Sequence, residues 1–123
     1  MCADNRRVAA LALLAALAAC VVNSASTVPV KRAVADADVL NEQQVQVHGV
    51  IGSWHGGVNL FSPNRDECIG LLATETEVLR LRAYEGKAIS VRGKLEAQGC
   101  GRDGICDEHL CGPAVLSSAR LEK

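Results

Sequence analysis

Four cysteines and a histidine are the residues of this chain with the clearest capacity for chemistry. Cys100, Cys106 and Cys111 fall within twelve residues, His109 lies between the last two, and Cys68 lies upstream. Three thiolates and an imidazole, from Cys100, Cys106, His109 and Cys111, could bind zinc tetrahedrally or take up copper. An even number of cysteines in an oxidising compartment instead predicts two disulfides, for which four cysteines permit three pairings.

The spacing of these residues favours disulfides over metal. Neither a paired zinc knuckle nor a Cys-x-x-Cys redox motif occurs in the chain. Metal binding stays the alternative, because the ligand types themselves are suitable. The compartment decides between the two chemistries, and the N-terminus indicates that compartment.

The N-terminus has the layout of an export signal. Arg6 and Arg7 precede an apolar run over residues 8–22, which is too short to cross a bilayer as a helix. The tetrapeptide Leu17-Ala18-Ala19-Cys20 in this run resembles the lipobox of bacterial lipoprotein signals. That resemblance implies loss of residues 1–19 and a diacylglycerol thioether on Cys20. A soluble protein cut near residues 24–26 and an uncut anchor are the alternatives.

Lipidation of Cys20 predicts a location in the cell envelope. Two or more acyl chains anchor a protein firmly, so the membrane is an expected partner through this lipid. Val21 is not the aspartate associated with inner-membrane retention, which implies the outer membrane, facing the periplasm, in a Gram-negative host. In that compartment Cys68, Cys100, Cys106 and Cys111 are expected to pair, and no cofactor is expected.

The charge of the chain argues against a nucleic-acid partner. Without Arg6, Arg7 and Asp4 it carries eleven basic and thirteen acidic side chains, a net charge of −2 with histidine neutral. It has no basic field for phosphates and, with one Trp, one Tyr and one Phe, few stacking platforms. We therefore expect no binding to nucleic acid.

The sequence also lacks the motifs of an enzyme. It contains no Gly-x-Ser-x-Gly elbow, no His-Glu-x-x-His, no phosphate-binding glycine loop and no recognisable carboxylate pair. Trp54 and His55 form the other conspicuous pair, either as ligand contacts or with Trp54 filling the core. We expect a non-enzymatic protein.

Periodicity predicts the elements after residue 40. Polar–apolar alternation and apolar runs predict strands over 44–51, 58–61, 68–72, 87–95 and 114–121. Thr74 and Glu77 are typical of a helix N-terminus and Gly86 of a C-terminus, so one helix should follow the third strand. Residues 20–40 lack a steady period and are expected to be a flexible tether, with a strand near 28–30 as the alternative.

The order of these elements resembles the OB-fold, a five-stranded Greek-key barrel. Two strands share Val-x-Gly-x-aliphatic, and Gly49 and Gly93 in them mark bends where such a sheet closes. We therefore expect a mainly β domain with one helix (β-β-β-α-β-β) over residues 41–123, after a signal peptide (1–19) and the tether (20–40). An open α+β sheet with the helix packed on one face is the alternative. The chain is similar to small bacterial lipoproteins built on such barrels.

The resemblance also implies a disulfide pairing and a binding surface. The third and fifth OB strands run parallel, which implies Cys68–Cys111 and leaves Cys100–Cys106. It places the ligand face on the second and third strands, flanked by the loops at 54–55 and 101–108. The residues expected on this face are Trp54, His55, Asn59, Phe61 and Arg65.

The function that follows is a lipid-anchored, disulfide-braced binding or structural module of the cell envelope. Its expected partner is an envelope protein or a saccharide. The alternative is a periplasmic lipoprotein that binds zinc or copper through the loop from Cys100 to Cys111.

Overall fold

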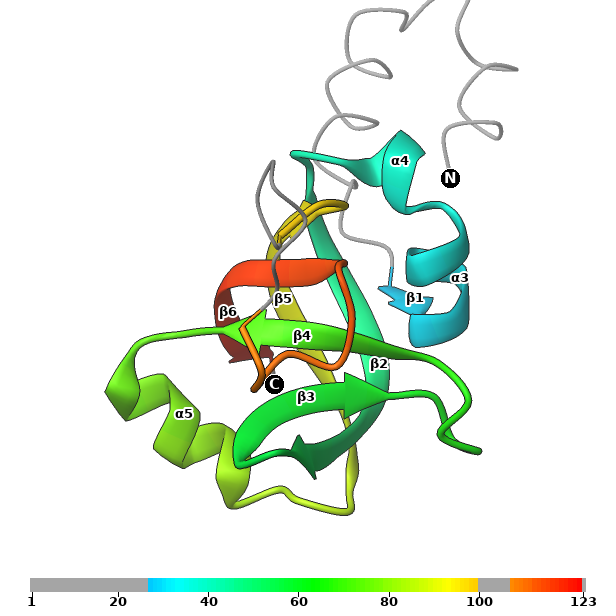
Figure 1. Cartoon of the computed structure of the whole chain (residues 1–123). Helices are drawn as coiled ribbons and strands as arrows, with labels where there is room; N and C mark the ends of the chain where they lie inside the picture. Colours follow the sequence, from blue (N-terminus) through cyan, green and yellow to red (C-terminus); the bar gives the residue numbers. More distant parts are fainter. Residues whose placement is uncertain (1–26, 100–106, 123) are drawn as a thin grey trace, which may run out of the picture.

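The computed structural model describes residues 27–99 and 107–122, which form mainly β structure with three short helices (Figure 1). The strands are β1 (Thr27–Pro29), β2 (Gln44–Trp54), β3 (Gly57–Phe61), β4 (Cys68–Leu72), β5 (Ala88–Glu96) and β6 (Val115–Glu122). The helices are α3 (Val30–Ala35), α4 (Ala37–Leu40) and α5 (Glu75–Arg82). The prediction of a mainly β domain is confirmed. The described residues have six strands rather than five, and α3 and α4 in addition to the expected helix.

The strands form one sheet in the order β1-β2-β3-β4-β6-β5, with a further pairing of β2 to β5. The first part of β2 pairs with β5 and its second part with β3, and Val50 pairs with both. β4 and β6 are parallel, with Gly70 opposite Val115. β2 therefore pairs with three strands, β1, β3 and β5, and each of β3 to β6 pairs with two. The side chains between them include Val47, Leu60 and Leu95, which are fully buried.

The two glycines predicted at bends do lie at irregular places of the sheet. Gly49 precedes the residue at which β2 changes partner, and a Cβ there would lie 2.6 Å from Val30 Cγ2 and 2.7 Å from the Phe61 carbonyl oxygen. Gly93 lies at the register shift between Arg92 and Lys94 in the β5–β6 pairing. Both positions require close backbone approach, which only glycine permits.

Residues 27–40 form part of the folded domain, which corrects the tether predicted over 20–40. β1 pairs in parallel with β2, and α3 and α4 follow (Figure 1). Val30 and Ala33 of α3 are fully buried, and Ala37 of α4 is also buried. The alternative of an added strand is therefore the correct one for residues 27–29, while residues 20–26 lie outside the described ranges.

The predicted helix is present as α5, and its N-terminus is capped as expected. The Thr74 hydroxyl accepts a hydrogen bond from the Glu77 amide at 3.2 Å. The Glu77 carboxylate, however, accepts from the amide of Leu121 in β6 at 2.8 Å and lies 3.3 Å from Arg80. Glu77 therefore ties α5 to the last strand rather than closing the first turn of the helix.

The predicted signal peptide and the lipidation site Cys20 lie outside the described residues. Over residues 27–99 and 107–122, no helix has the length and hydrophobicity needed to cross a membrane.

Candidate functional site

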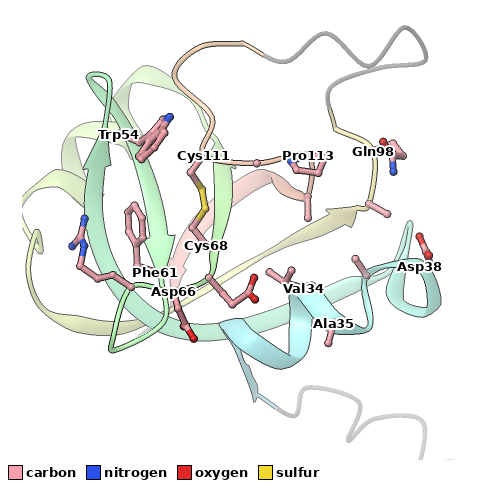
Figure 2. Close-up of a pocket in the computed structure, with 16 residues that line it drawn as sticks. Val34, Ala35, Asp38, Trp54, Phe61, Asp66, Cys68, Gln98, Cys111 and Pro113 are labelled. Carbon is pink, nitrogen blue, oxygen red and sulfur yellow. A yellow bond between two sulfur atoms is a disulfide. The ribbon is translucent and has the colours of Figure 1, made fainter.

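A pocket of about 460 Å³ lies between the N-terminal helices, the end of the β2–β3 hairpin and the segment that precedes β6 (Figure 2). Its lining combines two aromatic residues, a disulfide, several small apolar residues and four charged residues. The lining residues are Val34, Ala35, Ala37, Asp38, Trp54, Phe61, Arg65, Asp66, Glu67, Cys68, Ala97, Gln98, Cys111, Gly112, Pro113 and Ala114.

The wall of this pocket contains the disulfide Cys68–Cys111, whose Cα atoms are 6.3 Å apart (Figure 2). Cys68 begins β4 and Cys111 shortly precedes β6, and these two strands are parallel. Parallel pairing places the two strand starts at the same end of the sheet, as the OB resemblance implied. The other expected bridge, Cys100–Cys106, lies outside the described residues.

Three of the five residues expected on a binding surface line this pocket. The Phe61 ring is largely buried and has the Arg65 guanidinium over its face, 4.1 Å from the ring centroid. Gly52 of β2 leaves room for this pair, since a Cβ there would lie 2.9 Å from the ring and 3.1 Å from Arg65 Nη1. Trp54 is 42% exposed. It borders the pocket rather than filling the core.

The β2–β3 hairpin fixes the position of Trp54. His55 and Gly56, at φ of 47° and 85°, form a two-residue turn between the paired Trp54 and Gly57, the geometry that favours the strand twist. The His55 ring stacks on the indole at 4.9 Å between centroids and does not line the pocket. Arg82 of α5 donates to the Gly56 carbonyl at 2.7 Å.

Asn59 is not a surface residue, which corrects its predicted place on the binding face. Its side chain is fully buried and donates to the carbonyls of Gly57, at 3.2 Å, and His109, at 3.1 Å. Its carbonyl oxygen accepts from the amide of Cys111 at 3.2 Å. Asn59 therefore holds the segment that carries Cys111 against β3, and it supports the pocket from behind Cys111 without lining it.

The turn between β3 and β4 places a carboxylate at the rim. The Ser62 hydroxyl donates to Asp66 at 2.7 Å and accepts from the Glu67 amide at 3.0 Å. The Lys31 ammonium lies 3.3 Å from the same Asp66 carboxylate. The hydrogen bond from Ser62, and then the contact with Lys31, hold the pKa of Asp66 below its ordinary value of 3.8.

The sequence interpretation missed the contribution of α3 and α4, which supply Val34, Ala35, Ala37 and Asp38 to the lining. A signal for these helices was present. Val30, Ala33, Val34 and Ala37 follow the i, i+3, i+4, i+7 spacing of a helix with one apolar face.

The structure bears on the alternative metal site at two of its four residues. The sulfur of Cys111 is bonded to Cys68 and is not a thiolate ligand in this state, and Cys100 and Cys106 lie outside the described residues. The His109 ring nitrogen Nδ1 contacts the carbonyl of His55. The described residues contain no group of three or more side chains arranged to hold a metal ion.

Comparison with known proteins supports the fold but shows no family. No protein-family model matches this sequence, and no curated protein matches it. The crystal structure of a putative nucleic acid-binding lipoprotein from Klebsiella pneumoniae subsp. pneumoniae MGH 78578 is similar, with a TM-score of 0.56 and 14% sequence identity. The match covers 84% of this chain and 96% of that chain.

This likeness corrects the expectation that nucleic acid is excluded as a partner. The exclusion rested on the net charge and the few aromatic residues, yet the same fold occurs in a lipoprotein described as putatively nucleic acid-binding. Net charge is a property of the whole surface and does not report what one local site binds. Nucleic acid therefore belongs among the ligands to be tested.

Proposed function

We propose that this protein is an exported, lipid-anchored and non-enzymatic module that binds a component of the cell envelope in the pocket beside Cys68–Cys111. The observation that carries the proposal is the convergence of Trp54, Phe61 and Arg65 on one wall of that pocket. A concave site with apolar walls and a few polar groups is the usual form of a binding site.

The proposed architecture is an OB-like barrel, to which β1, α3 and α4 are added. The support is the chain of pairings that returns from β5 to β2, together with the parallel β4–β6 pair. In an OB-fold the ligand face lies on the strands that correspond to β3 and β4 here. Phe61 ends β3 and Cys68 begins β4, so the pocket lies at one end of that face.

The proposed anchor is the lipid on Cys20. The support is the lipobox-like sequence and the occurrence of this fold in another lipoprotein. Cys20→Ala, in the full-length protein, is expected to abolish acylation and to release the protein from the membrane fraction. Membrane retention of an unacylated Cys20→Ala protein would contradict this anchor, and the mass of the N-terminal peptide decides the point.

The pocket is tested by photo-crosslinking in native membranes. A photoreactive amino acid at Gln98, which is exposed and lines the pocket, should attach to a partner that mass spectrometry can identify. The same amino acid at Leu79, which is 66% exposed on α5, is the control for non-specific contact. A single identified protein or glycan from Gln98 supports the proposal.

The Trp54→Ala variant decides whether the crosslink reports binding in the pocket. It removes an exposed aromatic wall without opening the core, so the crosslink from Gln98 should be lost while the fold is retained. An undiminished crosslink, or the same product from Leu79, would place the binding site elsewhere.

A further inference from the structure

The pocket contains carboxylates that form no ion pair or hydrogen bond within the described part of the protein. Among the described lining residues, Asp38, Asp66 and Glu67 carry carboxylates and Arg65 a positive charge. Lys31 balances Asp66 from outside the lining, which leaves Asp38 and Glu67 as the uncompensated carboxylates. The Arg65 guanidinium lies over Phe61, and Asp66 is engaged by Ser62 and Lys31. Within the described part of the chain, the carboxylates of Asp38 and Glu67 have no hydrogen-bond or ion-pair partner.

From this charge and from the aromatic wall, we infer that the pocket receives an extended, lysine- or arginine-bearing peptide segment of another envelope protein. The inference rests on the proposed function and narrows its ligand. A lysine or arginine side chain of the ligand could form ion pairs with the unpaired carboxylates. Its aliphatic stem and cation also suit the exposed indole of Trp54, through apolar contact and cation–π attraction.

The distribution of these groups favours a segment over a single small ion. In Figure 2 the aromatic residues Trp54 and Phe61 lie at one end of the pocket, and Asp38 and Gln98 lie at the other. The disulfide and Val34 lie between the two ends. An extended chain can place one side chain at the aromatic end and a second beside Asp38, while small apolar residues contact its backbone.

The test measures binding of labelled peptides to the full-length protein in detergent by fluorescence polarisation. The probes are a decapeptide of alternating lysine and leucine and its counterparts with glutamine or glutamate in place of lysine. Asp38→Asn combined with Glu67→Gln should weaken binding of the lysine peptide by about tenfold, since each removes one ion pair at a partly exposed site. Glu75→Gln, which neutralises an exposed carboxylate on α5, should leave it unchanged.

Two further probes separate failure of this inference from failure of the proposed function. They are a soluble cell-wall saccharide fragment and a single-stranded oligonucleotide, each measured with the unsubstituted protein and with Trp54→Ala. If either binds in a Trp54-dependent way while the lysine peptide does not, the pocket binds ligand and the basic-peptide inference is wrong. If no probe or crosslink depends on Trp54, both proposals are wrong. Lysine-peptide binding that is unaffected by the double neutralisation also overturns the inference.

Discussion

Asn59 shows how one buried polar side chain shapes this pocket. It uses both amide hydrogens and its carbonyl oxygen on backbone groups, two of which belong to His109 and Cys111. A buried amide in an apolar core is tolerated only when such partners are present. The residue therefore acts as a local support for the segment that carries the disulfide.

Replacement of Asn59 should lower the stability of the fold. Asn59→Ala leaves the carbonyls of Gly57 and His109 and the amide of Cys111 without their partner. We expect the free energy of unfolding in urea to fall by about 2–3 kcal/mol, which is the range for unsatisfied polar groups combined with a small cavity. Gln98→Ala, at an exposed position, should change it by less than about 0.5 kcal/mol. Equal stability of the two variants would show that the network contributes nothing.

Asp66 makes the stability of the fold depend on pH in the acidic range. Its pKa is lowered in the folded state, so the ionised carboxylate stabilises the fold fully above the unfolded value, 3.8, and this contribution is lost as pH falls through the folded pKa. Ser62→Ala removes the main cause and should move the NMR titration midpoint of Asp66 up toward 3.8. Lys31→Ala should also raise it. An unchanged midpoint in Ser62→Ala would exclude the hydroxyl as the cause.

At the scale of elements, the helix α3 packs so closely on β2 that one position of this strand must be glycine. The Val30 side chain of α3 occupies the space that a side chain at position 49 would need. The helix and the strand can therefore lie this close together only because residue 49 is glycine. The same close contact brings α3 beside the start of β4, where Val34 lines the pocket. The pocket therefore depends on the N-terminal elements as well as on the main sheet.

Gly49→Ala tests this contact. The added methyl group would lie 2.6 Å from Val30 Cγ2, 2.7 Å from the Phe61 carbonyl oxygen and 2.9 Å from Leu60 Cγ. Overpacking of this kind lowers the free energy of unfolding by about 1–3 kcal/mol. Gly112→Ala is the matched control, since no atom of residues 27–99 and 107–122 lies within 4 Å of a Cβ there. Calorimetry of both variants should show a lower melting temperature for Gly49→Ala alone.

Periodicity was sufficient to predict the main elements, because each has a strong local signal. The polar–apolar alternation in 44–51 and 87–95 is a local pattern that can be read directly from the sequence. The same is true of Thr74, which precedes α5. The helices α3 and α4 were missed because they are short, so that most of their stability comes from packing on the sheet. Their apolar spacing was visible, but six residues and four residues give little periodicity to recognise.

At the scale of the whole molecule, the pairing of distant strands was accessible only through the resemblance to a known fold. Composition and periodicity do not predict that β4 and β6 are neighbours. It is the parallel pairing of these two strands that places their first residues at the same end and brings Cys68 and Cys111 together. The same holds for the site. Trp54, Phe61 and Arg65 were predicted on one surface, whereas Asn59 was placed wrongly because strand alternation does not reveal which face a long loop covers.

The disulfide Cys68–Cys111 links residues 43 positions apart, so it restricts the unfolded chain over more than a third of its length. For a loop of this size the entropic contribution to stability is about 4 kcal/mol. The double variant Cys68→Ser/Cys111→Ser should therefore unfold at lower urea concentration, with a free energy of unfolding lower by about that amount. Reductant should bring the unsubstituted protein down to the level of the variant or below it.

The variant itself reports on the remaining cysteines. If Cys100 and Cys106 also form a bridge, reductant should lower the stability of the variant by about 2 kcal/mol more, because the smaller loop restricts the chain less. If the oxidised protein and the double variant unfold together, the bridge does not stabilise the fold. The parallel pairing of β4 and β6 would then have to be maintained by the core residues Ile69, Val115 and Leu116 alone.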